Sequence, residues 1–226
     1  MTARAKEPFH FFTRLSLTSM TGIKAKNLQE LLESLKTVPE TVVYYHTHRF
    51  LQQHQYLVPE PPNDFAYWVT NMLQNKKLGE RLAAIDTVQF NTLSDLRAAF
   101  VRVLEESLKE NNNDRQAPPE GEEFHFMQAV RFSLPTPYQA WDLGEFVSCL
   151  KKVSISSLYL HIFEARLRPP LGINDFSYWL DNQLAEKELA KKIAGFDPYT
   201  QTLEGLRVRI IGFMEQRLKE IPRAAP

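Results

Sequence analysis

The chain has few of the residues that would tie it to a redox or metal function. One cysteine, Cys149, occurs among 226 residues. A single cysteine excludes an intramolecular disulfide and a metal cage built from cysteines. In an internal alignment of the sequence, Cys149 lies opposite Ser34, so a small packed side chain is a simpler interpretation than a reactive thiol. No cofactor is implied.

Charge of one sign and long apolar runs are also missing. The 27 Lys and Arg balance 27 Asp and Glu, so no overall field favours nucleic acid or an anionic membrane. No apolar stretch approaches the length that spans a bilayer, and residues 1–8 are polar, unlike a secretory signal. We therefore expect a soluble, cytoplasmic protein without nucleic-acid or membrane partners. A protein partner and self-association both remain open.

The sequence does contain a repeated motif, Asn-Asp-Phe-X-Tyr-Trp, at residues 63–68 and again at 174–179. Around it, residues 9–50 align without a gap to 124–165 with 12 identities, and the two motif segments extend the similarity. This self-similarity predicts a tandem duplication. We expect unit 1 at residues 9–110, a polar linker at 111–123 and unit 2 at 124–220.

Apolar spacing and capping signals predict about five helices in each unit, preceded by a short extended or strand-like arm that begins at Phe-His-Phe. Asn27 with Glu30, and Asp142 with Glu145, have the spacing of capping boxes. The predicted fold is mainly α, with two homologous helical units related by pseudo-twofold symmetry.

Two runs resemble a known family. Residues 44–51 read Tyr-Tyr-His-Thr-His-Arg-Phe-Leu, and residues 61–68 read Pro-Pro-Asn-Asp-Phe-Ala-Tyr-Trp. Together they resemble an uncharacterised family of bacterial and archaeal proteins classed as a domain of unknown function, over essentially the whole chain. The resemblance implies no activity, cofactor or catalytic residue.

Two histidine and aspartate pairs are the candidates for catalysis: His46 with Asp64, and His161 with Asp175. An aspartate that orients an imidazole supports general-base chemistry, with Tyr44 nearby in the first pair. The simpler interpretation is structural, because an inward histidine hydrogen-bonds a buried group and an aspartate at a helix start caps that helix.

A metal site is not predicted. His46, His48 and His54 are the nearest to a ligand set, but His46 and His48 point about 200° apart on one helix. Zinc needs three or four convergent ligands.

The segment where the two copies differ is a second place to look for a site. His48, Arg49 and His54 form a partly basic patch that leads into the loop 51–62, and an anion is a conceivable ligand there. No phosphate-binding loop accompanies it. A solvated helix end is the simpler interpretation.

The aromatic residues of the repeated motif have two interpretations. Phe65 and Trp68 are spaced as buried residues of a helix, whereas Tyr67 and Tyr178 are the exposed candidates for ligand binding. Three hypotheses follow: a non-enzymatic binding or scaffold protein, an enzyme of unknown reaction with a His–Asp pair, and a small-molecule or anion sensor that uses His48, Arg49 and the tyrosines.

Overall fold

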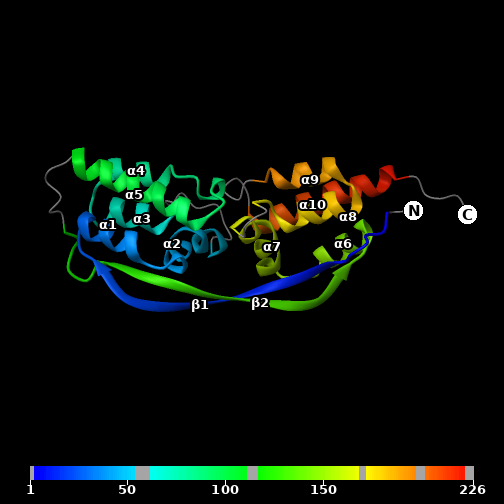
Figure 1. Cartoon of the computed structure of the whole chain (residues 1–226), viewed down its shortest axis with the longest axis horizontal. Coiled ribbons are helices and arrows are strands. Elements are labelled where there is room, and N and C mark those ends of the chain that lie inside the picture. The colour runs from blue at the N-terminus through cyan, green and yellow to red at the C-terminus, as the bar shows by residue number, and fades with distance from the viewer. Residues whose placement is uncertain (1–2, 54–61, 111–116, 168–171, 197–201, 222–226) are drawn as a thin grey trace, which may run out of the picture. The chain divides into compact units, whose positions relative to one another are not determined.

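The computed structural model describes residues 3–53, 62–110, 117–167, 172–196 and 202–221. Two strands of 17 residues, β1 (Phe9–Ala25) and β2 (Phe124–Ala140), pair as an antiparallel two-stranded sheet (Figure 1). In the described residues, five α-helices follow each strand. They are α1 (Leu28–Thr37), α2 (Glu40–Gln53), α3 (Asp64–Asn71), α4 (Lys76–Ala83), α5 (Leu93–Glu110), α6 (Leu143–Leu150), α7 (Ile155–Ile162), α8 (Asp175–Leu184), α9 (Lys187–Ala194) and α10 (Leu203–Glu220), with short 3₁₀ turns at Thr87–Gln89 and Glu164–Leu167.

The predicted mainly α fold with pseudo-twofold symmetry is wrong. The structure is 58% helix and 18% strand, and the ten helices of the described residues accompany a two-stranded antiparallel sheet, so the fold is mixed α/β. The sequence suggested only a short arm because apolar residues beyond Leu17 alternate poorly. A strand whose partner supplies its backbone hydrogen bonds does not need a strictly alternating apolar face, and much of β1 is exposed.

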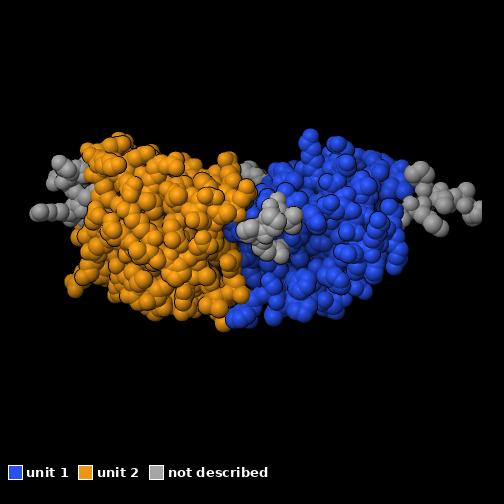
Figure 2. Space-filling view, in the orientation of Figure 1, with its two compact units in different colours: residues 1–15, 55–57, 132–226 blue, residues 16–54, 58–131 orange. Residues whose placement is uncertain are grey.

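Each strand contributes residues to two compact units. Unit 1 contains residues 1–15, 55–57 and 132–226, and unit 2 contains residues 16–54 and 58–131 (Figure 2). The first part of β1 therefore belongs with helices α6–α10, and the first part of β2 with helices α1–α5. The predicted units group each Phe-His-Phe arm with the helices that follow it in the chain. The compact units instead group each arm with the other set of helices, so their boundaries fall within β1 and β2. From here on, unit 1 and unit 2 refer to these compact units.

Local capping signals fix where several helices begin. The Asn27 side chain accepts from the Glu30 N–H at 2.8 Å, and Glu30 accepts in return from the N–H of Lys26, the residue before the cap. In α3, Asn63 accepts from the Ala66 N–H at 2.8 Å, and in α8, Asn174 accepts from the Ser177 N–H at 2.7 Å. Each such cap stabilises its helix by about 1 kcal/mol.

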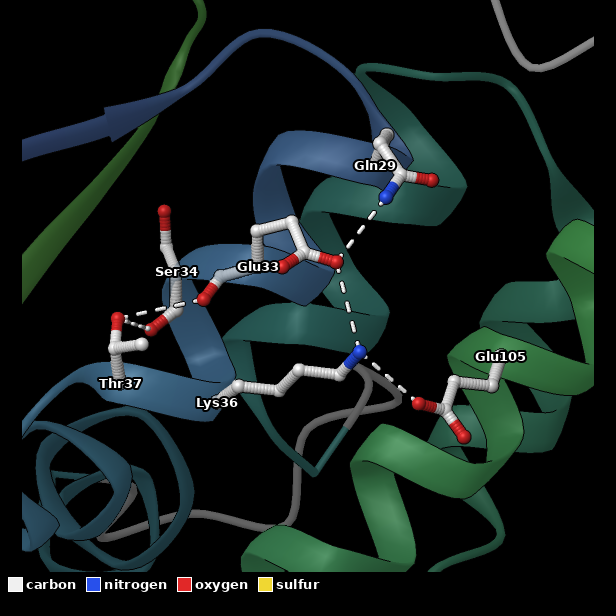
Figure 3. A network of polar contacts seen from close by, with 6 residues as sticks. All are labelled: Gln29, Glu33, Ser34, Lys36, Thr37 and Glu105. Atoms are coloured by element: carbon white, nitrogen blue, oxygen red, sulfur yellow. Dashed lines mark hydrogen bonds and ion pairs between the residues drawn. The ribbon is translucent and has the colours of Figure 1, made fainter.

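Polar contacts tie the surface of α1 to α5 in unit 2 (Figure 3). Lys36 Nζ lies 3.0 Å from Glu105 Oε1 and 3.5 Å from Glu33 Oε1, and Gln29 donates to Glu33. The hydrogen bond to Glu105 raises the pKa of Lys36. Because these side chains are solvated, the network orients two helices that already pack through apolar residues, and it adds little to the free energy of unfolding.

Unit 1 contains a buried ion pair. Arg14 Nη1 lies 3.0 Å from Glu164 Oε2, and the two side chains are 1% and 5% exposed. The Arg14 guanidinium also lies over the ring of Tyr159, 5.1 Å from its centroid.

None of the helices in the described part of the chain combines the length and apolar character that a bilayer crossing requires.

Candidate functional site

Two of the candidate catalytic residues, His161 and Asp175, lie where the first part of β1 meets the helices of unit 1. Phe9 and Phe11 are buried, and Phe9 packs edge-on against His161, Phe176 and Trp179 at centroid distances of 4.9–5.8 Å. The Trp179 indole N–H donates to the Glu7 carbonyl at 3.0 Å. Aromatic packing and this main-chain hydrogen bond therefore contribute to the docking of the arm.

Both ring nitrogens of His161 are engaged. Its Nδ1 lies 2.7 Å from Asp175 Oδ2, and its Nε2 accepts from the Phe12 backbone N–H at 2.9 Å. A nitrogen that accepts from an N–H carries no proton, so the other nitrogen carries it and donates to the carboxylate. His161 is thus the neutral Nδ1–H tautomer, and it is 4% exposed.

Unit 2 has the same set of contacts with different residues. His46 Nδ1 lies 2.8 Å from Asp64 Oδ2, and its Nε2 accepts from the Met127 N–H at 3.0 Å. The Trp68 indole donates to the Glu122 carbonyl at 2.7 Å. Phe124 and Phe126 are the buried rings of this arm.

The structure therefore brings the four catalytic candidates together as two His–Asp pairs. What each pair does in the structure is to hold a strand. A general base needs a lone pair that faces substrate, and here the Nε2 lone pair accepts from the backbone. The arrangement favours the structural interpretation of these histidines.

A pocket of about 320 Å³ opens beside the His161–Asp175 pair in unit 1. Tyr178 from α8 and Phe12 from β1 are its exposed rings, with 41% and 37% of their surface accessible. The remaining lining is Pro8, Phe9, His10, Ser133, Leu160, His161, Asp175 and Trp179. Tyr178 was predicted as a ligand-binding residue. Sequence reasoning missed Phe12, His10 and Ser133, because Phe12 and His10 reach the pocket through the position of β1, and Ser133 through the pairing of β2 with β1.

Two candidates of the anion hypothesis lie in the core of unit 2. Tyr44 and His48 are 0% and 2% exposed, and their rings stack with an interplanar angle of 9°. The Arg131 guanidinium lies 4.0 Å from the Tyr44 ring centroid. Burial, together with the charge of Arg131, lowers the pKa of His48 from 6.5 to about 3. A neutral, buried imidazole offers no positive charge to an anion.

The other candidates have separate positions. Tyr67 is exposed on α3, with 44% of its surface accessible. His54, most of the loop 51–62 and the side chain of Arg49 lie outside the described residues. Phe65 and Trp68 are buried at 0% and 5%, which confirms that they are core residues. Within the described ranges, no three His, Cys, Asp or Glu side chains converge as a metal site would require.

Fold and site together define a mixed α/β protein in which each compact unit binds an extended aromatic arm through a tryptophan and a histidine. The chain belongs to the DUF5752 family, a family of unknown function whose model matches residues 6–215. It is similar to the solved structure titled "The structure of OrfY from Thermoproteus tenax", with 27% identity and a TM-score of 0.80. The similarity covers 95% of this chain and 97% of that chain. No curated protein sequence matches the chain.

Proposed function

We propose that this protein is a non-enzymatic binding protein, and that the pocket beside His161 and Asp175 in unit 1 takes a small ligand. The pocket carries this proposal because two large rings, Tyr178 and Phe12, stay exposed at its rim. Small-molecule sites are concave and mostly aromatic or apolar, with a few polar groups that orient the ligand.

The lining supports a flat ligand with a polar edge. Phe12, Tyr178 and Trp179 offer ring faces and edges, and Ser133, His10 and Asp175 supply hydroxyl, imidazole and carboxylate groups. Stacking between aromatic rings contributes about 0.5–1.5 kcal/mol beyond the burial of area. Removal of one rim ring is therefore expected to weaken binding measurably.

The histidines support binding over catalysis. His161 lines the pocket, yet its Nδ1 donates to Asp175 and its Nε2 accepts from the Phe12 N–H. An imidazole held in this way shapes the wall of the pocket and keeps β1 in position. Proton transfer to a ligand would first require the loss of the bond to Phe12.

The test uses indole and p-cresol as probes, with binding followed by saturation-transfer NMR. The native chain is expected to give saturation transfer to both probes, and Tyr178→Ala to reduce it strongly. Tyr67→Ala is the matched control, because Tyr67 has the same place in the repeated motif and similar exposure but lies on α3 of unit 2. Equal signals from the native chain and Tyr178→Ala would contradict the proposal.

A further inference from the structure

One five-residue pattern, Glu-X-Phe-His-Phe, occurs at residues 7–11 and at 122–126. Both copies bind their helices through the same groups. A tryptophan indole donates to the glutamate carbonyl, from Trp179 to Glu7 and from Trp68 to Glu122. A histidine accepts from the N–H of the residue after the second phenylalanine, at Phe12 and at Met127.

Between these two main-chain contacts, the phenylalanine rings supply the specificity. Phe9 and Phe11 are 6% and 1% exposed, and Phe124 and Phe126 are 5% and 1% exposed. Alternate residues of a strand point to the same face, so both rings of each arm enter the helical layer together. The histidine between them, His10 in β1, is exposed and contributes little to the fit.

The helices thus form a groove that binds an extended peptide. In unit 1 the groove is formed by α6, α7 and α8, through Phe146, His161, Phe176 and Trp179. Main-chain hydrogen bonds combined with pockets for alternate side chains are the general mode by which proteins bind an added strand. The groove of unit 1 is filled by a segment of its own chain.

We infer that the groove of α6–α8 is a receptor for an extended Glu-X-Phe-His-Phe segment, and that it accepts this segment from a second copy of the chain. Two different segments with this pattern make matching contacts with two sets of helices, so every copy of the chain carries segments that fit such a groove. A segment supplied by another copy would repeat the contacts of the native arm, and such an exchange costs little because no contact is lost.

The competition between the two sources decides when exchange occurs. An arm in the same chain has a high effective concentration, because the pairing of β1 with β2 holds it beside α6. The arm of a second copy therefore enters the groove when the internal arm is weakened or when the chain is highly concentrated.

The test weakens the internal arm and supplies the segment in trans. The full chain carries Phe9→Ser with Phe11→Ser, and the probe is a fluorescent synthetic peptide of residues 4–15, followed by fluorescence anisotropy. We expect the double variant to bind this peptide about tenfold or more tightly than the native chain does, because the internal competitor is lost. A second peptide, residues 119–130, is expected to bind as well.

Two controls keep the result specific. A peptide of residues 4–15 with both phenylalanines replaced by serine is expected not to bind. The milder Phe11→Leu variant keeps an apolar side chain in the groove, so its affinity for the peptide should lie between those of the native chain and the double variant.

Circular dichroism accompanies the titration in case the double variant does not fold. Recovery of the native spectrum on addition of the peptide then counts as binding. If the double variant is folded and binds neither peptide, the inference is wrong. If the double variant is unfolded, the inference is wrong when the peptide does not restore the native spectrum and the Phe11→Leu variant also binds no peptide.

Discussion

The indole of Trp179 donates its N–H to the backbone carbonyl of Glu7, 172 residues earlier in the chain, at 3.0 Å. Trp68 makes the matching bond to Glu122 at 2.7 Å. These bonds join the beginning of each arm to α8 and to α3, helices that start with the repeated motif. The motif therefore serves the attachment of an arm as well as the helical core.

Replacement of Trp179 by phenylalanine tests this bond. Trp179→Phe keeps a buried ring but removes the N–H, which leaves the Glu7 carbonyl without its partner. We expect a loss of about 1–2 kcal/mol in the free energy of unfolding. Trp68→Phe is expected to lose a similar amount, measured by urea denaturation. A far smaller loss in either variant would show that the indole bond contributes little to docking of the arm.

The imidazoles of His46 and His161 are expected to contribute to stability. His161→Ala removes the hydrogen bonds to Asp175 and to the Phe12 N–H, and it opens a cavity beside Phe9. Together these losses should cost roughly 2–4 kcal/mol. His46→Ala should cost a comparable amount. His10→Ala is the control, because an exposed side chain outside such contacts changes stability by about 0.5 kcal/mol or less. Thermal melts of the three variants provide the measurement.

His48 is expected to make stability depend on pH. Its pKa is about 3 in the folded chain and near 6.5 when unfolded. Between about pH 3 and pH 6.5, His48 binds a proton in the unfolded state but not in the folded state. Stability should therefore fall as the pH is lowered below 6.5, by up to about 1.4 kcal/mol per pH unit for this one group.

The His48→Phe variant isolates that effect. Phenylalanine is native at the corresponding position of unit 1, where Phe163 packs against Tyr159 at 5.7 Å. We expect the variant to show a shallower loss of stability between pH 6 and pH 4 than the native chain does, in urea titrations at several pH values. Identical slopes in the two proteins would contradict the assignment of this pH dependence to His48.

The buried ion pair of Arg14 and Glu164 should be sensitive to loss of one partner. Glu164→Ala leaves the Arg14 guanidinium buried without its carboxylate, and breaking a buried pair in this way costs about 3–5 kcal/mol. The exposed pair of Lys151 and Glu215, 2.7 Å apart, is the matched control. Glu215→Ala should cost less than about 1 kcal/mol. Chemical denaturation of both variants distinguishes the two cases.

Local features of the fold were predictable from the sequence. Asn27 and Asp142 cap helices as expected, because a cap depends on residues three positions away. The inward direction of His46 and His161 also follows from helical spacing, and both are buried. The pairing of each histidine with an aspartate was one of two interpretations that the sequence left open.

Long-range features were not predictable. The partner of β1 is β2, more than 100 residues later, and no local pattern indicates which helices an arm will meet. Phe12 illustrates the difficulty. Its backbone N–H donates a hydrogen bond to His161, and its ring lines the pocket. The residues around Phe12 in the sequence predict only an extended segment and do not indicate either contact. The prediction of a mainly α fold failed for the same reason.

The division of β1 between two compact units also has a consequence for biosynthesis. Unit 2 draws only on residues within 16–131, whereas unit 1 combines residues 1–15 and 55–57 with residues from 132 onward. Translation at roughly 5–20 residues per second separates Glu7 from Trp179 by about 10–30 s. Phe9 and Phe11 are therefore made long before their groove exists. Vectorial synthesis on the ribosome lets unit 2 fold first, and it leaves the aromatic arm of unit 1 accessible to chaperones and to neighbouring nascent chains until α8 emerges.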